Sequence, residues 1–130
     1  MRDLRCFLFG EAEKGPLCIP KVCKSVEELF IHFGEPPKES GGIFFAIQAL
    51  FLGREVIFYR VKEEGYSFED YFKGFILLKE KQYGNELAAI FLPGVGSRAI
   101  LDEVTPISNE LNSLLVINHK DFYDYLTDLD

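Results

Sequence analysis

Short apolar segments with the composition of buried strands alternate with helical segments along this 130-residue chain. The strand-like segments are rich in β-branched and aromatic residues, and glycine or proline closes several of them. The helical segments place apolar residues three and four positions apart, which gives each helix an apolar face. Strands that alternate with helices in this way are typical of βαβ units on one sheet. The sequence therefore predicts a single three-layer α/β domain over residues 1–130, with a mainly parallel or mixed sheet flanked by helices.

The predicted strands differ in how clearly the sequence marks them. The clearest is REVIFYRV at 54–61, and LRCFLFG, LAAIFL and LLVIN have the same β-rich, apolar character. PKVCK is a shorter extended piece. The predicted extended segments are residues 4–10, 20–24, 54–61, 87–92 and 114–118.

The helix between Ser25 and Gly34 has both of its ends marked. Ser25 and Glu28 have the spacing of a capping box, in which each side chain accepts a hydrogen bond from the other residue's free backbone N–H. Gly34 is expected to end the helix in the left-handed conformation. Ser67 and Asp70 repeat the capping spacing at the start of a helix that runs to about residue 80.

Three further features of the predicted helices are less regular. Gly74 lies inside the helix that starts at Ser67, at a cost of about 1 kcal/mol relative to alanine. The segment IFFAIQALFL at 43–52 has Gln48 as its only polar residue and is predicted to be a helix buried on nearly all sides. Pro106 lies within the apolar period of the following helix and should kink it, or restart it with Thr105 as cap. A short terminal helix is predicted over residues 121–129, with Phe122, Leu126 and Leu129 facing the core.

Composition limits the class of partner. The formal net charge of −7 argues against nucleic acid, since a phosphate-binding surface needs clustered lysine and arginine. The longest apolar run, at 43–52, is about half of a membrane span, so no membrane contact is predicted. Cys6, Cys18 and Cys23 lack the spacing of a zinc or redox site and are predicted to be reduced, which suits the cytoplasm.

The segment PGVGSR at 93–98 is the most enzyme-like feature. It follows a predicted strand and opens a helix, so Gly94, Gly96, Ser97 and Arg98 form a candidate anion or phosphate site. It matches neither established glycine-rich phosphate motif, and the alternative is a tight turn with Ser97 as the helix N-cap. No cofactor is therefore predicted.

Other candidate catalytic or metal-binding residues do not form a constellation. A nucleophile triad would need Ser97, His119 and either Asp102 or Asp121, but no nucleophile-elbow motif is present. His32 and His119 lie in different elements and are interpreted as structural. The sequence therefore predicts no catalytic residue and no metal site.

The order of glycines, prolines and apolar residues resembles that of the core domain of tail sheath proteins from contractile phage tails and related contractile injection systems. The similar block in that family is a strand, a Gly-x-Ala-x-x-Gly-Pro turn, a second short strand, and a helix that ends in Phe-Gly. Tyr59-Arg60-Val61 and LAAIFLPG at 87–94 are similar to later family segments. The matching residues of the first block are Gly10, Ala12, Gly15, Pro16, Pro20, Ser25, Leu29, Phe30, Phe33 and Gly34.

The resemblance implies a non-enzymatic structural protein that acts through contacts with other protein subunits, its own kind or components of a tail-like particle. Such a protein would be found in the cytoplasm or in the particle. The sequence resembles the sheath core without the terminal arms and later domain, so it is expected to be a minor or capping subunit, a remnant, or a fragment. Exposed loops at 11–16, 36–42 and 62–66 are the predicted contact surfaces. The interface candidates are Glu11, Glu13, Lys14, Lys38, Glu39, Lys62, Glu63 and Glu64.

Overall fold

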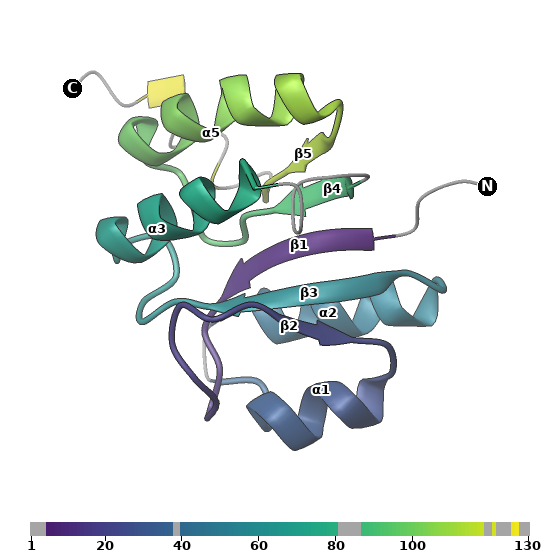
Figure 1. Ribbon diagram of the computed structural model, residues 1–130. Helices are drawn as coiled ribbons and strands as arrows, with labels where there is room; N and C mark the ends of the chain where they lie inside the picture. The colour runs from purple at the N-terminus through teal and green to yellow at the C-terminus, as the bar shows by residue number, and fades with distance from the viewer. Residues whose placement is uncertain (1–4, 38–39, 81–86, 119–120, 122–125, 128–130) are drawn as a thin grey trace.

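A five-stranded mixed sheet lies between two layers of helices in the computed structural model, which describes residues 5–37, 40–80, 87–118, 121 and 126–127 (Figure 1). The strands are β1 (Arg5–Gly10), β2 (Lys21–Cys23), β3 (Glu55–Arg60), β4 (Leu87–Phe91) and β5 (Leu114–Val116). Their order across the sheet is β2-β3-β1-β4-β5. β3, β1, β4 and β5 are mutually parallel, and β2 pairs antiparallel with β3 at one edge. The predicted α/β class is confirmed.

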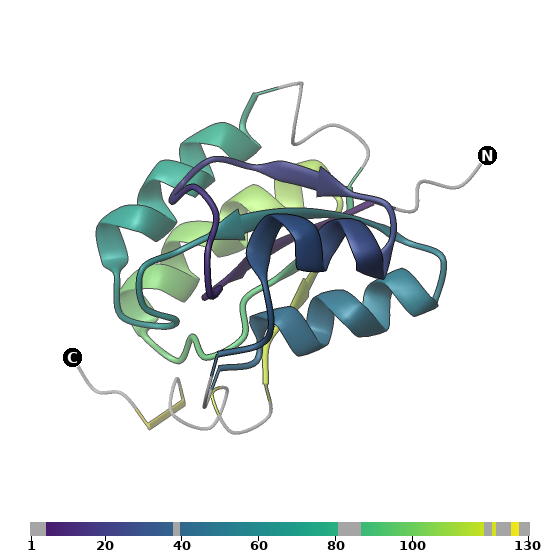
Figure 2. The same cartoon turned by 90° about the horizontal axis from the view of Figure 1, so that it is seen from below.

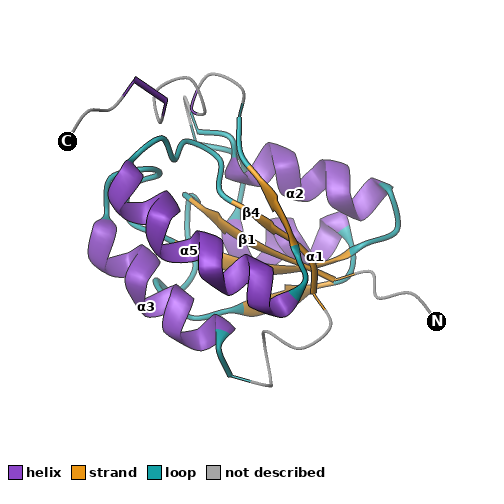
Figure 3. Cartoon of the chain, turned by 90° about the horizontal axis from the view of Figure 1, so that it is seen from above, coloured by secondary structure: helices purple, strands orange, loops and turns teal. Residues whose placement is uncertain are grey.

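The helices are divided between the two faces of the sheet. Those that the described residues define are α1 (Val26–Phe33), α2 (Gly42–Phe51), α3 (Phe68–Leu78) and α5 (Arg98–Leu111). α1 and α2 lie side by side on one face (Figure 2), and α3 and α5 lie side by side on the other (Figure 3). After β1 the chain continues to α1 and α2, which cover one face of the sheet. After β4 it continues to α5, which covers the other face. The carboxyl ends of β1 and β4 therefore form the topological switch point, where open α/β sheets commonly bind ligands.

The central strand β1 supplies side chains to both layers of the core. Phe7 and Phe9 belong to the cluster under α3 and α5, whereas Leu8 belongs to the cluster under α1 and α2. All three are fully buried. This is the alternation of side chains expected of a strand that is covered on both faces.

Gly74 has a packing role inside α3. A β-carbon at this position would lie 2.9 Å from Cζ of Phe9 and 3.1 Å from Cε1 of Tyr59. The ring of Phe9 also stacks on Tyr71, with 5.4 Å between the ring centroids. The glycine that is unfavourable for an isolated helix therefore lets α3 approach the aromatic side chains of the sheet.

The caps of α1 and α3 differ in detail from the expected capping boxes. The Ser25 hydroxyl accepts from the N–H of Glu28 at 3.2 Å, as predicted, but the Glu28 carboxylate accepts from Lys24 rather than Ser25. Gly34 ends α1 at φ 79° and ψ −162°, which is not the left-handed helical conformation. Ser67 precedes α3 without a side-chain capping bond.

Two predictions about helices are wrong, those for the burial of α2 and of Leu126, and one alternative for Pro106 is not observed. α2 is not buried on nearly all sides, because Phe44, Gln48 and Phe51 are exposed. The restart of α5 at Pro106 is not observed, since one helix runs from Arg98 to Leu111 and contains the proline, and a kink at Pro106 stays a prediction. The predicted helix at 121–129 lies mostly outside the described residues, and Leu126, expected to face the core, is exposed.

Candidate functional site

The carboxyl end of the sheet is occupied by the side chain of Glu64, from the loop after β3. Its carboxylate accepts hydrogen bonds from the backbone N–H groups of Glu11 at 2.9 Å, Gly41 at 3.0 Å and Gly42 at 2.9 Å. Gly41 and Gly42 begin α2, so the carboxylate also lies at the positive end of the helix dipole. A protein group thus takes the place of a bound anion at this helix N-terminus.

The backbone around Glu64 is closely packed. A β-carbon on Gly10 would lie 2.8 Å from the α-carbon of Gly42, so the end of β1 and the start of α2 are in backbone contact. A β-carbon on Gly94 would lie 3.2 Å from that of Glu64. The end of β1 and the loops after β3 and β4 therefore meet at the switch point, where other α/β folds commonly bind a ligand.

Glu11 and Glu64 form a reciprocal pair. The N–H of Glu64 donates to the Glu11 carboxylate at 2.9 Å, as the N–H of Glu11 donates to Glu64. Burial raises the pKa of the Glu64 carboxyl above its ordinary value, the three backbone donors act in the opposite direction, and the charge of Glu11 adds to the increase. Desolvation outweighs the hydrogen bonds.

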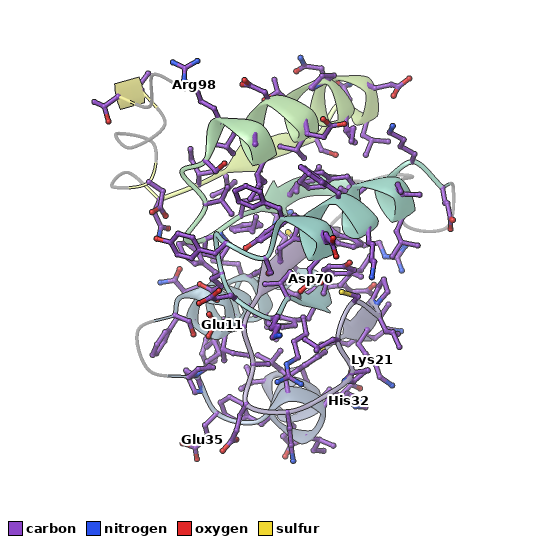
Figure 4. All side chains as sticks on the ribbon, turned by 90° about the vertical axis from the view of Figure 1, so that its left-hand side faces the viewer. Glu11, Lys21, His32, Glu35, Asp70 and Arg98 are labelled. Atoms are coloured by element: carbon purple, nitrogen blue, oxygen red, sulfur yellow. The ribbon has the colours of Figure 1, made fainter. Side chains whose placement is uncertain are left out.

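The candidate anion loop at 94–98 opens α5 as a tight turn. The N–H of Gly94 donates to the Asp121 carboxylate at 2.9 Å. Ser97 is the N-cap residue of α5 but makes no side-chain capping bond. Figure 4 shows Arg98 near one end of the molecule, with Glu11 well away from it. Anion binding by Gly94, Gly96, Ser97 and Arg98 stays a prediction, and two carboxylates already lie against Gly94.

The predicted interface residues are not equivalent. Glu13, Lys14, Lys62 and Glu63 are exposed, in agreement with their assignment to surface loops. Glu64 is only 8% exposed, so its prediction as an exposed interface residue is wrong. The reason is the row of backbone donors that it satisfies, which sequence spacing does not reveal. Glu11 is half-buried for the same reason, and Lys38 and Glu39 lie outside the described residues.

The loop at 11–16 packs on the carboxyl end of α1. The N–H groups of Glu13 and Lys14 both donate to the carbonyl of Phe33, at 3.1 and 3.2 Å. The Glu13 carboxylate accepts from the N–H of Glu35 at 3.0 Å. The Arg60 guanidinium donates to the carbonyl of Gly15. Several residues that carry the family resemblance therefore make contact with one another, and their role in this fold is structural.

An apolar groove between α2 and the strands β4 and β5 is a feature that the sequence did not predict. It has a volume of about 240 Å³. One wall comes from α2 and the floor from β4 and β5, with small alanine side chains in the floor. The lining residues are Cys6, Phe45, Gln48, Ala49, Leu52, Arg54, Ala88, Ala89, Phe91, Leu114 and Val116.

Large exposed apolar side chains border this groove. Leu52 is 77% exposed and Leu114 is 68% exposed, and both line it. Phe44 and Phe51 are 56% and 79% exposed, and they share a helical face with Gln48, which also lines the groove. We call this surface the α2–β5 patch. The spacing of Phe44, Gln48 and Phe51 was a signal for it, but the uniformly apolar sequence of α2 obscured which face would be buried.

Several other properties bear on the kind of site present. Within the described ranges, no group of three or more His, Cys, Asp or Glu residues is placed to hold a metal ion. None of the described helices is long and apolar enough to cross a membrane. Cys6, Cys18 and Cys23 are free thiols, as predicted. His32 is half-buried on α1, and His119 lies outside the described residues.

Comparison of the chain with protein-family models, with curated proteins and with solved structures gave no match.

Proposed function

We propose that this protein is a non-enzymatic structural subunit that acts through protein–protein contacts, in an assembly of the kind formed by the core domains of contractile tail sheaths. The observation that carries the proposal is the α2–β5 patch. Exposed Leu52 and Leu114 line a groove with an apolar floor, and exposed Phe44 and Phe51 lie on the adjoining outer face of α2. Contiguous apolar patches of several hundred Å² on soluble domains commonly mark interaction sites.

The position of Glu64 at the switch point supports the same proposal. An α/β enzyme commonly places its substrate at the carboxyl ends of the strands. Here Glu64 occupies that position and accepts three backbone hydrogen bonds. The likeness of residues 5–61 to the first part of a sheath core directs the proposal toward a tail-like particle.

The proposal is tested by the behaviour of the full chain in its source cells. A tagged chain should sediment with large particles in clarified lysate, and those particles should appear as tubes or rings by negative-stain electron microscopy. Thermal unfolding of the purified chain should show no increase in Tm with inorganic phosphate or with nucleotides, because a ligand that binds the folded state raises Tm. A chain that remains in the low-mass fraction and gains Tm with phosphate would contradict the proposal and favour the loop at 94–98 as a ligand site.

A further inference from the structure

We propose that the α2–β5 patch binds the same patch of a second copy of this chain, so that two copies form a dimer with two-fold symmetry. This inference rests on the proposed function, because it identifies the partner of the surface on which that function depends.

The size of the patch agrees with that of a stable dimer interface. A fully exposed phenylalanine or leucine presents roughly 200 Å². Phe44, Phe51, Leu52 and Leu114 are 56%, 79%, 77% and 68% exposed, and together they present roughly 500 Å² of apolar surface. A standard interface buries about 800 Å² on each partner, and the half-buried lining residues Phe45, Phe91 and Val116 add to the total.

The patch has the shape that a two-fold contact needs. In such a dimer the same surface is used twice, so it must contain both a projection and the hollow that receives it. The outer face of α2 projects, with Phe44 and Phe51 at its two ends. The groove over β4 and β5 lies beside it, and the small side chains of Ala88 and Ala89 are among its lining residues. Two copies related by a two-fold axis can each place the outer face of α2 in the groove of the other.

The charges of the molecule favour this surface for contact between identical copies. The chain carries a net charge of −7, so two copies repel each other over most approaches. Among the described residues, the groove lining contains no carboxylate, and Arg54 is the one charged side chain. The described part of the patch therefore brings no acidic side chains of the two copies against each other. Added salt screens the remaining repulsion, so the dimer should become tighter as ionic strength rises.

The experiment compares three single variants of the full chain by sedimentation velocity, from low to high micromolar concentration and at low and high salt. The wild type should dimerise more tightly at high salt. Phe51→Glu and Leu114→Glu should each weaken dimerisation on the order of tenfold or more, since truncation or charge at the centre of an interface costs more than about 1.4 kcal/mol. Ile76→Glu is the matched control, because Ile76 is 63% exposed on α3, in the opposite helix layer.

The three side chains are exposed, so each variant should keep the wild-type Tm, and circular dichroism checks that it does. A second measurement is amide hydrogen exchange, which should slow in β5 as the wild-type concentration rises. A wild type that stays monomeric throughout would overturn the dimer. So would a dimer that Ile76→Glu disrupts and the two patch variants do not. Association that weakens at high salt would indicate that the copies meet through ion pairs rather than through the apolar patch, and it would also overturn the proposal.

The result is distinguishable from a failure of the proposed function. A monomeric chain that still sediments with tube-like particles overturns the dimer and leaves the structural role intact. A chain that dimerises through the patch and never enters particles overturns the tail-like role and leaves the dimer intact.

Discussion

Glu64 connects three segments that are far apart in the sequence. Its carboxylate accepts from N–H groups after β1 and at the start of α2, and its main chain lies against Gly94 after β4. Buried backbone N–H groups that lose their acceptor cost about 1–3 kcal/mol each. A single carboxylate therefore satisfies donors that the closed end of the sheet would otherwise leave without partners.

Replacement of Glu64 by alanine should destabilise the protein by on the order of 2–4 kcal/mol, because three backbone donors lose their acceptor and water replaces it only in part. Urea unfolding followed by circular dichroism measures the change. Glu63→Ala is the matched control, since the neighbouring glutamate is exposed and its replacement should change stability by less than about 0.5 kcal/mol. Equal losses in the two variants would refute this role for Glu64.

The raised pKa of Glu64 gives a prediction about pH. As the pH falls from neutral, the folded protein binds a proton at Glu64 before the unfolded chain does, because the folded pKa lies above the ordinary value of 4.5. The contribution of this group to the unfolding free energy is therefore fully present below 4.5 and is lost as the pH rises through the folded pKa. The unfolding free energy of wild type minus that of Glu64→Gln, which does not titrate, should increase as the pH falls through this window. A difference that shrinks over the same window would contradict the direction of the pKa shift.

Among the elements, α3 shows how packing overrides helix propensity. Gly74 costs its helix about 1 kcal/mol relative to alanine when the helix is considered alone. Overpacking a core costs about 1–3 kcal/mol, and an alanine β-carbon here would press on Phe9 and Tyr59. The tertiary contact should therefore outweigh the local preference.

Gly74→Ala should accordingly destabilise the protein by about 1–2 kcal/mol, although propensity alone predicts a gain of about 1 kcal/mol. The measurement is the midpoint of chemical denaturation. The control is Lys73→Ala, at the adjacent exposed position of α3, where the change tests helix propensity without a contact to Phe9 or Tyr59. It should leave the unfolding free energy nearly unchanged. Stabilisation by Gly74→Ala would show that the helix moves away from the sheet at little cost.

The elements also show what the sequence was able to predict. The helical spacing of apolar residues predicted α1, α3 and α5, because each of these helices buries one face. Runs of β-branched and aromatic residues predicted the strands, because the sheet is covered on both faces. The period failed for α2, where nearly every residue is apolar and no polar face marks the exposed side. It also gave no account of Glu64, since its partners lie 22, 23 and 53 positions away and only the sheet topology brings them together.

At the scale of the whole molecule, the sheet separates two cores. Phe7, Phe9, Ile90 and Ile100 belong to the cluster on one face, and Leu8, Leu29 and Ile43 belong to the cluster on the other. Each cluster is built mainly from fully buried side chains. Small changes in different clusters share no packing partner, so their energetic effects should be independent.

Ile43→Val and Ile100→Val should each cost about 0.5–1.5 kcal/mol, because each removes one buried methyl group. The double variant should equal the sum within about 0.5 kcal/mol. A double-mutant cycle from urea unfolding measures the difference. The comparison pair is Ile100→Val with Val104→Ala, because Val104 lies one turn from Ile100 on α5. The loss of unfolding free energy in this double variant should differ more from the sum of the two single losses. Strong coupling between Ile43 and Ile100 would show that the sheet transmits strain between its faces.

The three backbone hydrogen bonds that the Glu64 carboxylate accepts, here called the Glu64 clamp, also have a consequence for the order of events in folding. Its hydrogen bonds close loops of up to 53 residues, and loop closure of this kind is costly before the surrounding strands have paired. We therefore expect the clamp to form after the rate-limiting step, once β1, β3 and α2 are already in place. A residue whose contacts form that late governs how quickly the native state opens rather than how quickly it is reached. The lifetime of the assembled molecule would then depend on a side chain that takes no part in starting its formation.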